Sequence, residues 1–352
     1  MKVVRDLSVT SANPGAGAPW DLPWMSPTTM TAPAMVLDFD AGIYGSDGQR
    51  QAMASVMNFD RASAATRFDD TGSLVTSPAD TARIEHDPVT LAPLGLLLEA
   101  GRTNLLVNTA APADQTVTVT ADTYVLSFYG TGSVALAGAY AGTFAGSGTF
   151  PTRTTVQFSA AAGALDVVFT GQVLFPQIEK AEEASSYIEC GASATARADD
   201  IATVPLGPWF SSSAGTIVFG GALLDAAAND RLIELDAGDT STRLSVLWNT
   251  TLGLPQLQVW DAGVLQAAIA PTGNSLGFGE TFRVVVSFAG NDFAISLNGS
   301  VPVKDTLGSL PTGLTNLRIG RSIWGAQGLL QAESLVYYPE RLSDAEIQAL
   351  SA

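Results

Sequence analysis

The sequence contains few side chains suited to acid–base or nucleophilic chemistry. His86, in "RIEHDPVT", is the only histidine, so a Ser-His-Asp triad would have to be built around it. The chain has no Gly-x-Ser-x-Gly motif, no phosphate-binding glycine loop and no histidine pair for zinc. Cys190 is the only cysteine, which excludes an intrachain disulfide and a cysteine-based zinc site. We therefore expect a protein that is not an enzyme.

Carboxylates offer the one catalytic alternative, because glycoside hydrolysis needs only two of them in different environments. A polysaccharide-degrading protein therefore stays open as a second hypothesis. Acidic loops on a β-sandwich are more often solvated surface, and the candidates are numerous. They are Glu179, Glu182, Glu183, Asp225, Asp230, Asp236 and Asp239.

Four of these acidic residues also allow a calcium site, in the segment "LLDAAANDRLIELDAGDTSTR". Asp225, Asp230, Asp236 and Asp239 lie near expected strand ends, and Ca²⁺ binds such clusters of oxygen atoms. The spacing is not that of an EF-hand loop, and Asp residues also cap turns. We expect no other cofactor.

Aromatic side chains could bind sugars, since sugar rings stack on indole faces. Trp324 lies in the glycine-rich segment "GRSIWGAQG", which favours an exposed loop and makes it the candidate for glycan contact. Trp248 and Trp260 lie in "RLSVLW" and "LQVW", which have the pattern of strands, and we expect both to pack in a core.

Composition restricts the partners. Asp and Glu number 34 against 17 Lys and Arg, which gives a net charge of −17 and argues against nucleic-acid binding. The hydrophobic fraction of 46% is sufficient for packed cores, yet no apolar run is long enough to span a membrane and none forms a secretory leader. We expect that the protein does not insert into a membrane. We also expect that it is assembled in the bacterial cytoplasm.

The strand pattern predicts an all-β chain with two antiparallel β-sandwiches. Residues 1–55 are rich in Pro, Gly, Ser and Thr and form an extended N-terminal docking arm, with Trp20 and Trp24 as anchors. The alternative is an arm folded back on its own domain. A connecting segment spans 56–108, a jelly roll 109–189, a linker 190–213 and a larger concanavalin A-like sandwich 214–352.

Two local signals are specific. Asn298-Gly299 between apolar runs predicts a tight hairpin. In "LSDAEIQALSA", Ser343 and Glu346 form a capping box, with Leu342 and Ile347 in the staple positions. The chain therefore ends in a short helix.

Three consecutive motifs, "FDRASAATRFDDTG", "RIEHDPVT" and "GLLLEAGRTNLL", resemble a segment of structural proteins from tailed bacteriophages and prophages. "TYVLSFYGTGSVALAG", "FPQIEKAEEASSYI" and "ATARADDI" resemble the carbohydrate-binding-like jelly roll that follows it. The ending "LRIGRS…YYPERLSDAEIQAL" is similar to a closing concanavalin A- or laminin G-like domain. The resemblance covers residues 55–352.

This resemblance implies a virion surface protein: a fibre, spike or decoration on the head or tail, or its equivalent in a gene-transfer particle. Its arm would anchor to other virion proteins, and its lectin-like sandwiches would meet host surface polysaccharide or act as spacers. We expect a homo-oligomer, and a trimer is the first oligomeric state to consider. A bacterial secreted lectin is a third hypothesis, which the missing leader disfavours.

The segment "GLLLEAGRTNLLVNT" places charges inside an apolar run. Arg61, Arg67, Glu99, Arg102 and Asn104 all fall in the matching motifs. We expect Glu99 to pair with Arg102 or another of these arginines, and Asn104 to cap a backbone turn. Such a structural clamp would fix the connecting segment to the jelly roll or to a neighbouring subunit.

Overall fold

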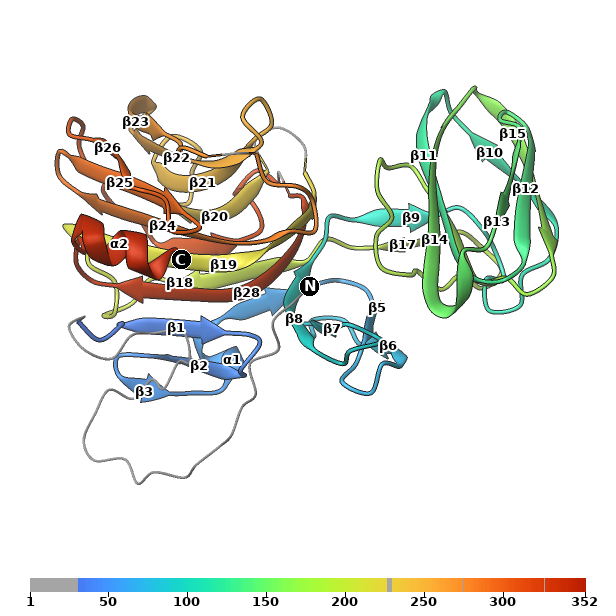
Figure 1. The fold of residues 1–352 in the computed structure, drawn as a ribbon, viewed down its shortest axis with the longest axis horizontal. Coiled ribbons are helices and arrows are strands. Elements are labelled where there is room, and N and C mark those ends of the chain that lie inside the picture. Colours follow the sequence, from blue (N-terminus) through green and yellow to red (C-terminus); the bar gives the residue numbers. More distant parts are fainter. Residues whose placement is uncertain (1–30, 227–229, 274, 326) are drawn as a thin grey trace.

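The structure, a computed structural model, describes residues 31–226, 230–273, 275–325 and 327–352. Trp20 and Trp24 lie outside these residues. The described chain is almost entirely β, with two short helices, α1 (Met53–Val56) and α2 (Asp344–Leu350). Figure 1 shows two separate β-sandwiches joined by a narrow connection. The expected fold class, two antiparallel sandwiches followed by a short C-terminal helix, is confirmed.

The small sandwich packs a four-stranded sheet against a three-stranded sheet. The first has the order β10 (Gln115–Val119), β15 (Gly163–Thr170), β12 (Ser133–Gly138), β13 (Gly142–Ala145). The second has the order β14 (Gly148–Ala160), β11 (Asp122–Gly130), β16 (Leu174–Glu179). Alternation along β11 sends Tyr124, Leu126 and Phe128 into the core between them.

The large sandwich packs a ten-stranded sheet against a seven-stranded sheet. The main path of the first is β26 (Val303–Asp305), β25 (Asp292–Leu297), β24 (Thr281–Ala289), β19 (Ala214–Asp225), β28 (Leu329–Tyr338), β1 (Met35–Asp38), β2 (Ile43–Ser46), β3 (Gln49–Arg50). β8 (Pro93–Leu98) also pairs with β28, and β7 (Ile84–His86) pairs with β8. The second sheet has the order β23 (Val264–Ile269), β22 (Leu254–Asp261), β21 (Arg243–Asn249), β20 (Arg231–Asp236), β27 (Asn316–Ile319), β18 (Ile201–Pro205), β4 (Asn58–Asp60).

The large sandwich is assembled from both ends of the chain, which corrects the expected boundaries. β1, expected in the arm, pairs with β28 along its whole length. β4 and β8, from the expected connecting segment, pair with β18 and β28. β18, expected in a linker, lies between β27 and β4. Local pattern reveals a strand but not a partner more than a hundred residues away, so these boundaries were wrong.

The two local signals are confirmed. Ser343 and Glu346 form the capping box of α2, and Leu342, Ile347 and Leu350 are buried in a small cluster with Val285 and Tyr338 of the ten-stranded sheet. Asn298 and Gly299 both have positive φ in the turn that joins β25 to β26. Neither helix of the described residues reaches the length and apolarity that crossing a membrane requires.

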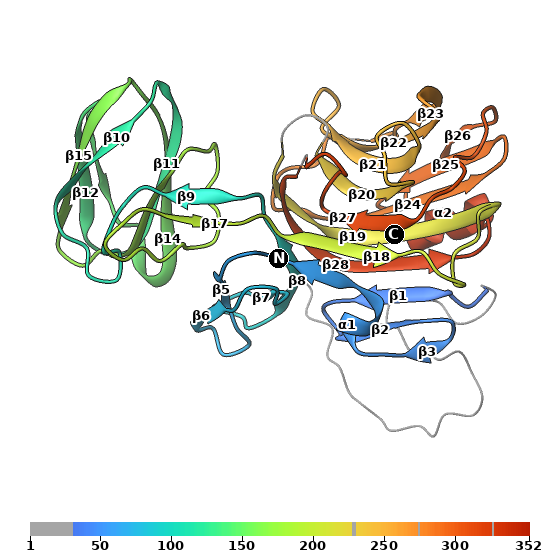
Figure 2. The ribbon, with the colours of Figure 1, turned by 180° about the vertical axis from the view of Figure 1, so that it is seen from behind.

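Two strands carry the chain between the sandwiches. β9 (Arg102–Asn104) runs outward and pairs with β17 (Thr195–Arg197), which returns. Both views show this ribbon between the two bodies (Figures 1 and 2). A hairpin of β5 (Ala65–Phe68) and β6 (Leu74–Ser77) lies beside it. Five buried charged residues lie where this ribbon meets the large sandwich: Arg61, Arg83, Glu99, Arg197 and Asp200.

Candidate functional site

Glu99 and Asp200 mark the points where the chain leaves and re-enters the large sandwich. Glu99 follows β8 and Asp200 precedes β18, and their backbones are hydrogen-bonded: Asp200 N donates to the Glu99 carbonyl at 3.0 Å. The Glu99 N–H donates in turn to Oδ2 of Asp200 at 2.9 Å. Both carboxylates are buried. The two chain crossings are therefore fixed to each other by backbone and side chain together.

Three buried arginines compensate these two carboxylates. Arg83 Nη2 bridges them, at 2.7 Å from Glu99 Oε2 and 2.5 Å from Asp200 Oδ2. Arg61 Nη1 lies 3.1 Å from Asp200 Oδ1, and Arg197 Nη1 lies 3.5 Å from Glu99 Oε2. We call these five residues the junction cluster. Charges this deeply buried are tolerated because each is paired and hydrogen-bonded.

The structure differs from the expected clamp in its partners. Glu99 pairs with Arg83 and Arg197, whereas the guanidinium of Arg102 donates to the adjacent Gly101 carbonyl and forms no ion pair within the described residues. Arg67 donates to the carbonyls of Phe68 and Ile84. Both carboxylate oxygens of Glu99 are occupied by Arg83 and Ser186, so neither is left for Arg102.

Asn104 holds the base of the small sandwich through four hydrogen bonds. Its Nδ2 donates to the carbonyls of Pro176 and Ile188, at 3.2 and 2.9 Å. Its Oδ1 accepts from the N–H groups of Leu106 and Ile178, both at 3.1 Å. A fully buried amide with both ends satisfied joins three chain segments at one point.

Arg83, Arg197 and Asp200 were missed at the level of the sequence. They lie in "TARIEH" and "ATARADDI", where each arginine follows a small residue beside a strand. One signal in the sequence could have indicated these residues: several of the motifs each contain an Arg, although the chain has only 17 Lys and Arg residues. Which arginine meets which carboxylate depends on strand pairing, so the sequence could not assign the pairs.

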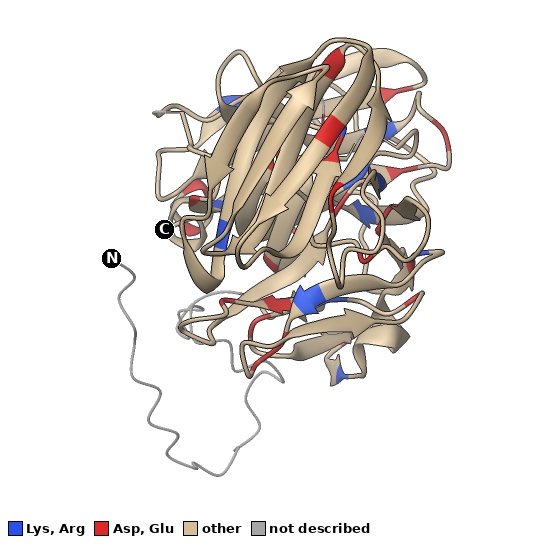
Figure 3. Ribbon diagram, turned by 90° about the vertical axis from the view of Figure 1, so that its right-hand side faces the viewer, with Lys and Arg blue, Asp and Glu red and all other residues tan. Residues whose placement is uncertain are grey.

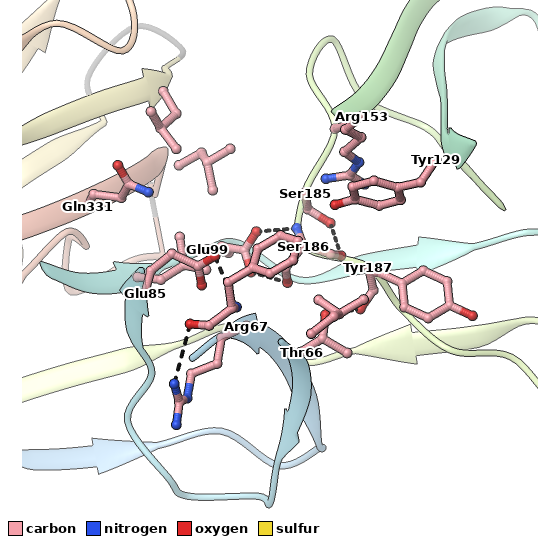
Figure 4. A pocket seen from close by; sticks show the side chains of 16 residues that line it. Thr66, Arg67, Glu85, Glu99, Tyr129, Arg153, Ser185, Ser186, Tyr187 and Gln331 are labelled. Carbon is pink, nitrogen blue, oxygen red and sulfur yellow. Dashed lines mark hydrogen bonds between the residues drawn. The ribbon is translucent and has the colours of Figure 1, made fainter. Parts of the chain in front are cut away.

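A pocket lies between the junction cluster and the small sandwich. Figure 4 shows Tyr129 and Arg153 on the small-sandwich side, Gln331 on the large-sandwich side, and Glu85 and Glu99 between them. Glu85 Oε1 accepts from the Phe68 N–H at 3.2 Å, and its Oε2 has no hydrogen-bond partner among the described residues. Ser186 donates to Glu99 through both its N–H and its hydroxyl, at 2.7 and 2.6 Å.

The pKa values of the two carboxyl groups in this pocket, Glu85 and Glu99, are shifted in opposite directions. Burial raises the pKa of Glu85 to about 7. Burial would raise that of Glu99 too, but Arg197, Arg83 and Ser186 together lower its pKa to about 2. A raised and a lowered carboxyl side by side are the electrostatic requirement for glycoside hydrolysis.

The geometry of the pocket does not fit that reaction. Its volume is about 120 Å³, well below the several hundred Å³ of a typical ligand pocket. Both oxygens of Glu99 are already occupied by Arg83 and Ser186. A sugar ring therefore has neither the room nor a free carboxylate in this conformation.

A second cluster lies on the face of the seven-stranded sheet that points away from the core. Arg231 Nε lies 2.9 Å from Glu234 Oε2, and the Ile323 N–H donates to Glu234 Oε1 at 2.8 Å. The buried Glu234 thereby holds the loop that carries Trp324. Trp324 is 46% exposed, as its glycine-rich loop predicts.

Guanidinium groups support this indole. Cζ of Arg231 lies 4.9 Å from the Trp324 ring centre, and Cζ of Arg243 lies 5.0 Å from it. Arg243 also lies 4.9 Å from the ring of Trp260, its cross-strand neighbour. Burial lowers the pKa of Arg243. We call Arg231, Glu234, Arg243, Trp260 and Trp324 the outer-face cluster.

The outer-face cluster corrects one expectation about the tryptophans. Trp248 is buried in the core, as predicted. Trp260 is only partly buried and faces outward, because Val259 takes the core position beside it. The pattern "QLQVW" already contained this signal, since alternation puts Gln256, Gln258 and Trp260 on one face.

These outward residues form a polar row along β22. Trp260 Nε1 donates to Gln258 Oε1 at 3.3 Å, and Gln258 Nε2 donates to Gln256 Oε1 at 3.1 Å. Asn249 Nδ2 also donates to Gln256 Oε1, at 3.3 Å. Amide groups beside an indole can donate hydrogen bonds to sugar hydroxyls and accept hydrogen bonds from them while the sugar ring stacks on the indole.

The calcium candidates do not come together. Asp236 pairs with Arg318 at 2.6 Å, and Asp239 caps a turn by accepting from the N–H groups of Ser241 and Thr242. Asp225 lines a separate small pocket with Arg102 and Glu183, and Asp230 is buried at the start of β20. The residues that the structure describes contain no group of three acidic, His or Cys side chains suited to a metal ion.

The remaining candidates for chemistry have structural partners or face solvent. Glu179 is buried and accepts from the Ser185 hydroxyl and N–H, at 2.5 and 3.0 Å. Glu182 and Glu183 are exposed. Nδ1 of His86 is buried without a hydrogen-bond partner in the described parts of the chain, so His86 lacks the carboxylate that a triad requires.

Comparisons with known proteins give similarities of fold. No family model and no curated protein sequence matches the chain. The CBM40 module of the Ruminococcus gnavus IT-sialidase, bound to alpha2,6 sialyllactose, is 15% identical over 40% of this chain and 85% of its own, with a TM-score of 0.35. Domain 4 of AbnA, a GH43 extracellular arabinanase from Geobacillus stearothermophilus in complex with arabinotriose, is 13% identical over 49% of this chain and 83% of its own, with a TM-score of 0.34.

The leech intramolecular trans-sialidase gives a similar result. It is 12% identical over 40% of this chain and 23% of its own, with a TM-score of 0.34. Identities and scores at this level carry no inference about ligands.

Proposed function

We propose that this protein binds glycans through the outer-face cluster, as a surface protein of a phage-like particle. The observation that carries the binding site is Trp324: its indole is 46% exposed yet supported by two guanidinium groups on a loop that the buried Glu234 holds. A preorganised aromatic surface loses little entropy when a sugar ring stacks on it. The amide row of β22 supplies hydrogen bonds beside it.

The placement on a virion rests on the sequence motifs that resemble tailed-phage structural proteins. In this proposal the large sandwich presents the outer-face cluster to host surface polysaccharide, and the N-terminal residues attach the protein to other virion proteins. The protein works as a homo-oligomer on the outer surface of the particle. It binds without cleaving, which is consistent with the small volume of the junction pocket and the occupied oxygens of Glu99.

The test measures binding of the purified protein to host cells and to their extracted surface polysaccharide, while the chain length of the polysaccharide is followed over time. We expect binding without shortening. Trp324→Ala should weaken it about 30-fold, as for a residue at the centre of an interface. Phe278→Ala is the matched control, because Phe278 is 53% exposed but lies against Trp248 at the other end of β21.

Three outcomes would contradict parts of the proposal. An equal loss of binding in Trp324→Ala and Phe278→Ala would indicate that the glycan binds away from Trp324. Shortening of the polysaccharide would favour the hydrolytic alternative and direct attention to Glu85. No binding of any host glycan would leave a structural spacer.

A further inference from the structure

The small sandwich has an edge strand of a kind that proteins usually protect. β14 (Gly148–Ala160) is the longest strand of the described chain and lies at the border of the three-stranded sheet, where it pairs with β11 alone. An edge strand has a row of backbone N–H and C=O groups without sheet partners. Its first half meets the junction, where Phe150 packs against Phe68 at 5.9 Å and Arg153 lines the pocket. Residues 154–160 continue away from that contact.

This second half has none of the usual protections. Residues 154–160, "TTVQFSA", contain no charge and no proline, and their register with β11 is unbroken. The other edge strands of the described chain are shorter: the uncharged ones, β10, β13 and β23, have five, four and six residues. β26 has three residues, including Lys304 and Asp305, and β4 has three residues, ending at Asp60. Short, charged edges resist pairing with other chains, and residues 154–160 do not.

The side chains of this edge leave room for a partner strand. Thr155, Gln157 and Ser159 are exposed, whereas Phe158 and Ala160 turn into the core of the small sandwich. All three exposed side chains are short or medium in length and uncharged. A strand added at this edge would meet hydroxyl and amide groups that can form cross-strand hydrogen bonds.

Low charge at this edge allows a second copy of this chain to be the partner. A net charge of −17 repels copies from one another over most of their surface. The strands of the small sandwich contain only four charged residues in the described chain, Asp122, Arg153, Asp166 and Glu179, and none of them lies in 154–160. Figure 3 shows how few charges this sandwich carries compared with the body behind it.

We propose that two copies associate by antiparallel pairing of residues 154–160 across a two-fold axis. A two-fold axis pairs a strand with itself in antiparallel orientation. Centred on Gln157, this register places Thr155 opposite Ser159 and Gln157 opposite its own copy, with no like charges facing each other. The two three-stranded sheets become one continuous sheet, and both outer-face clusters are carried by one particle component. The trimer expected from the sequence would instead need a head-to-tail contact.

The test is sedimentation of the full chain over a wide range of protein concentrations. We expect a concentration-dependent dimer. Gln157→Lys places two ammonium groups opposite each other and should weaken the dimer by at least about tenfold. Thr118→Lys is the matched control, because Thr118 is an exposed residue of β10 in the same sandwich and the charge change is the same. It should leave the dimer unchanged.

A second measurement identifies the contact directly. In a Cys190→Ser background, Gln157→Cys should be joined into a covalent dimer by a short bifunctional thiol reagent, and Thr118→Cys should not. Circular dichroism checks that each variant is folded. A monomer at all concentrations, a trimer, or a dimer that Gln157→Lys leaves intact would overturn the proposal. Association of Gln157→Cys with a different virion protein in place of itself would also overturn it.

Discussion

Arginine meets carboxylate in both the junction cluster and the outer-face cluster, yet the two regions differ in what surrounds them. In the junction cluster every charged side chain is buried, and the pairs hold two chain crossings together. In the outer-face cluster, Arg231 and Glu234 are buried beneath an indole that is itself nearly half exposed. The same ion pair is thus part of the architecture in one place and a support for a contact surface in the other. Solvent access, and not residue type, therefore separates the two roles.

The largest expected effect is the loss of Arg83. Arg83→Ala leaves Glu99 and Asp200 buried with one compensating charge fewer, and should lower the free energy of unfolding by about 3–5 kcal/mol. Urea denaturation measures it. If the loss were below about 1 kcal/mol, the junction cluster would not be the clamp between the sandwiches.

A pH dependence distinguishes the two carboxylates of the junction pocket. The pKa of Glu85 is raised from 4.5 to about 7, so the folded state holds one more proton than the unfolded state between these values. The free energy of unfolding should therefore fall as pH rises from 4.5 to 7, by up to about 3 kcal/mol. Glu99 acts in the opposite direction: its pKa is lowered to about 2, so its contribution is complete above 4.5 and is lost as pH falls towards 2.

Glu85→Gln tests this assignment. The variant should lack the decline between pH 4.5 and 7 and keep the acid-side loss that comes from Glu99. Unfolding measured in urea at several pH values gives both slopes. A wild-type decline that persists in the variant would assign the titration to another group.

On the outer face, Trp324→Ala should change stability far less than binding. The indole makes two partly exposed cation–π contacts, so the free energy of unfolding should fall by about 1 kcal/mol. Thermal denaturation provides the value. A loss of several kcal/mol would show that Trp324 is a core residue of its loop and would remove the contrast between the two clusters.

The smallest effect is expected for Arg102→Ala. Arg102 lies three residues from Glu99 but makes no ion pair with it, and its guanidinium is partly exposed. Stability should change by less than about 0.5 kcal/mol. A loss comparable to that of Arg83→Ala would restore the pairing expected from the sequence.

The sequence by itself determined what is local. Alternation in "TYVLSFYG" specified β11 and its core face, Asn298-Gly299 specified a hairpin, and Ser343 with Glu346 specified the start of α2. The glycine-rich surroundings of Trp324 likewise indicated its exposure. Each of these depends on residues within a few positions of one another, where backbone geometry leaves little choice.

Only the tertiary structure decided which distant strands pair in the large sandwich and which charges meet. β1 and β28, or Arg83 and Asp200, are separated by more than a hundred residues, and no periodicity encodes such pairs. The same holds for the core boundaries: β18 has a strand pattern, but only its place between β27 and β4 shows that it belongs to the large sandwich. Burial then decides the role of each residue. A buried, paired charge has a structural role, whereas a solvent-exposed indole offers a surface that can bind a ligand.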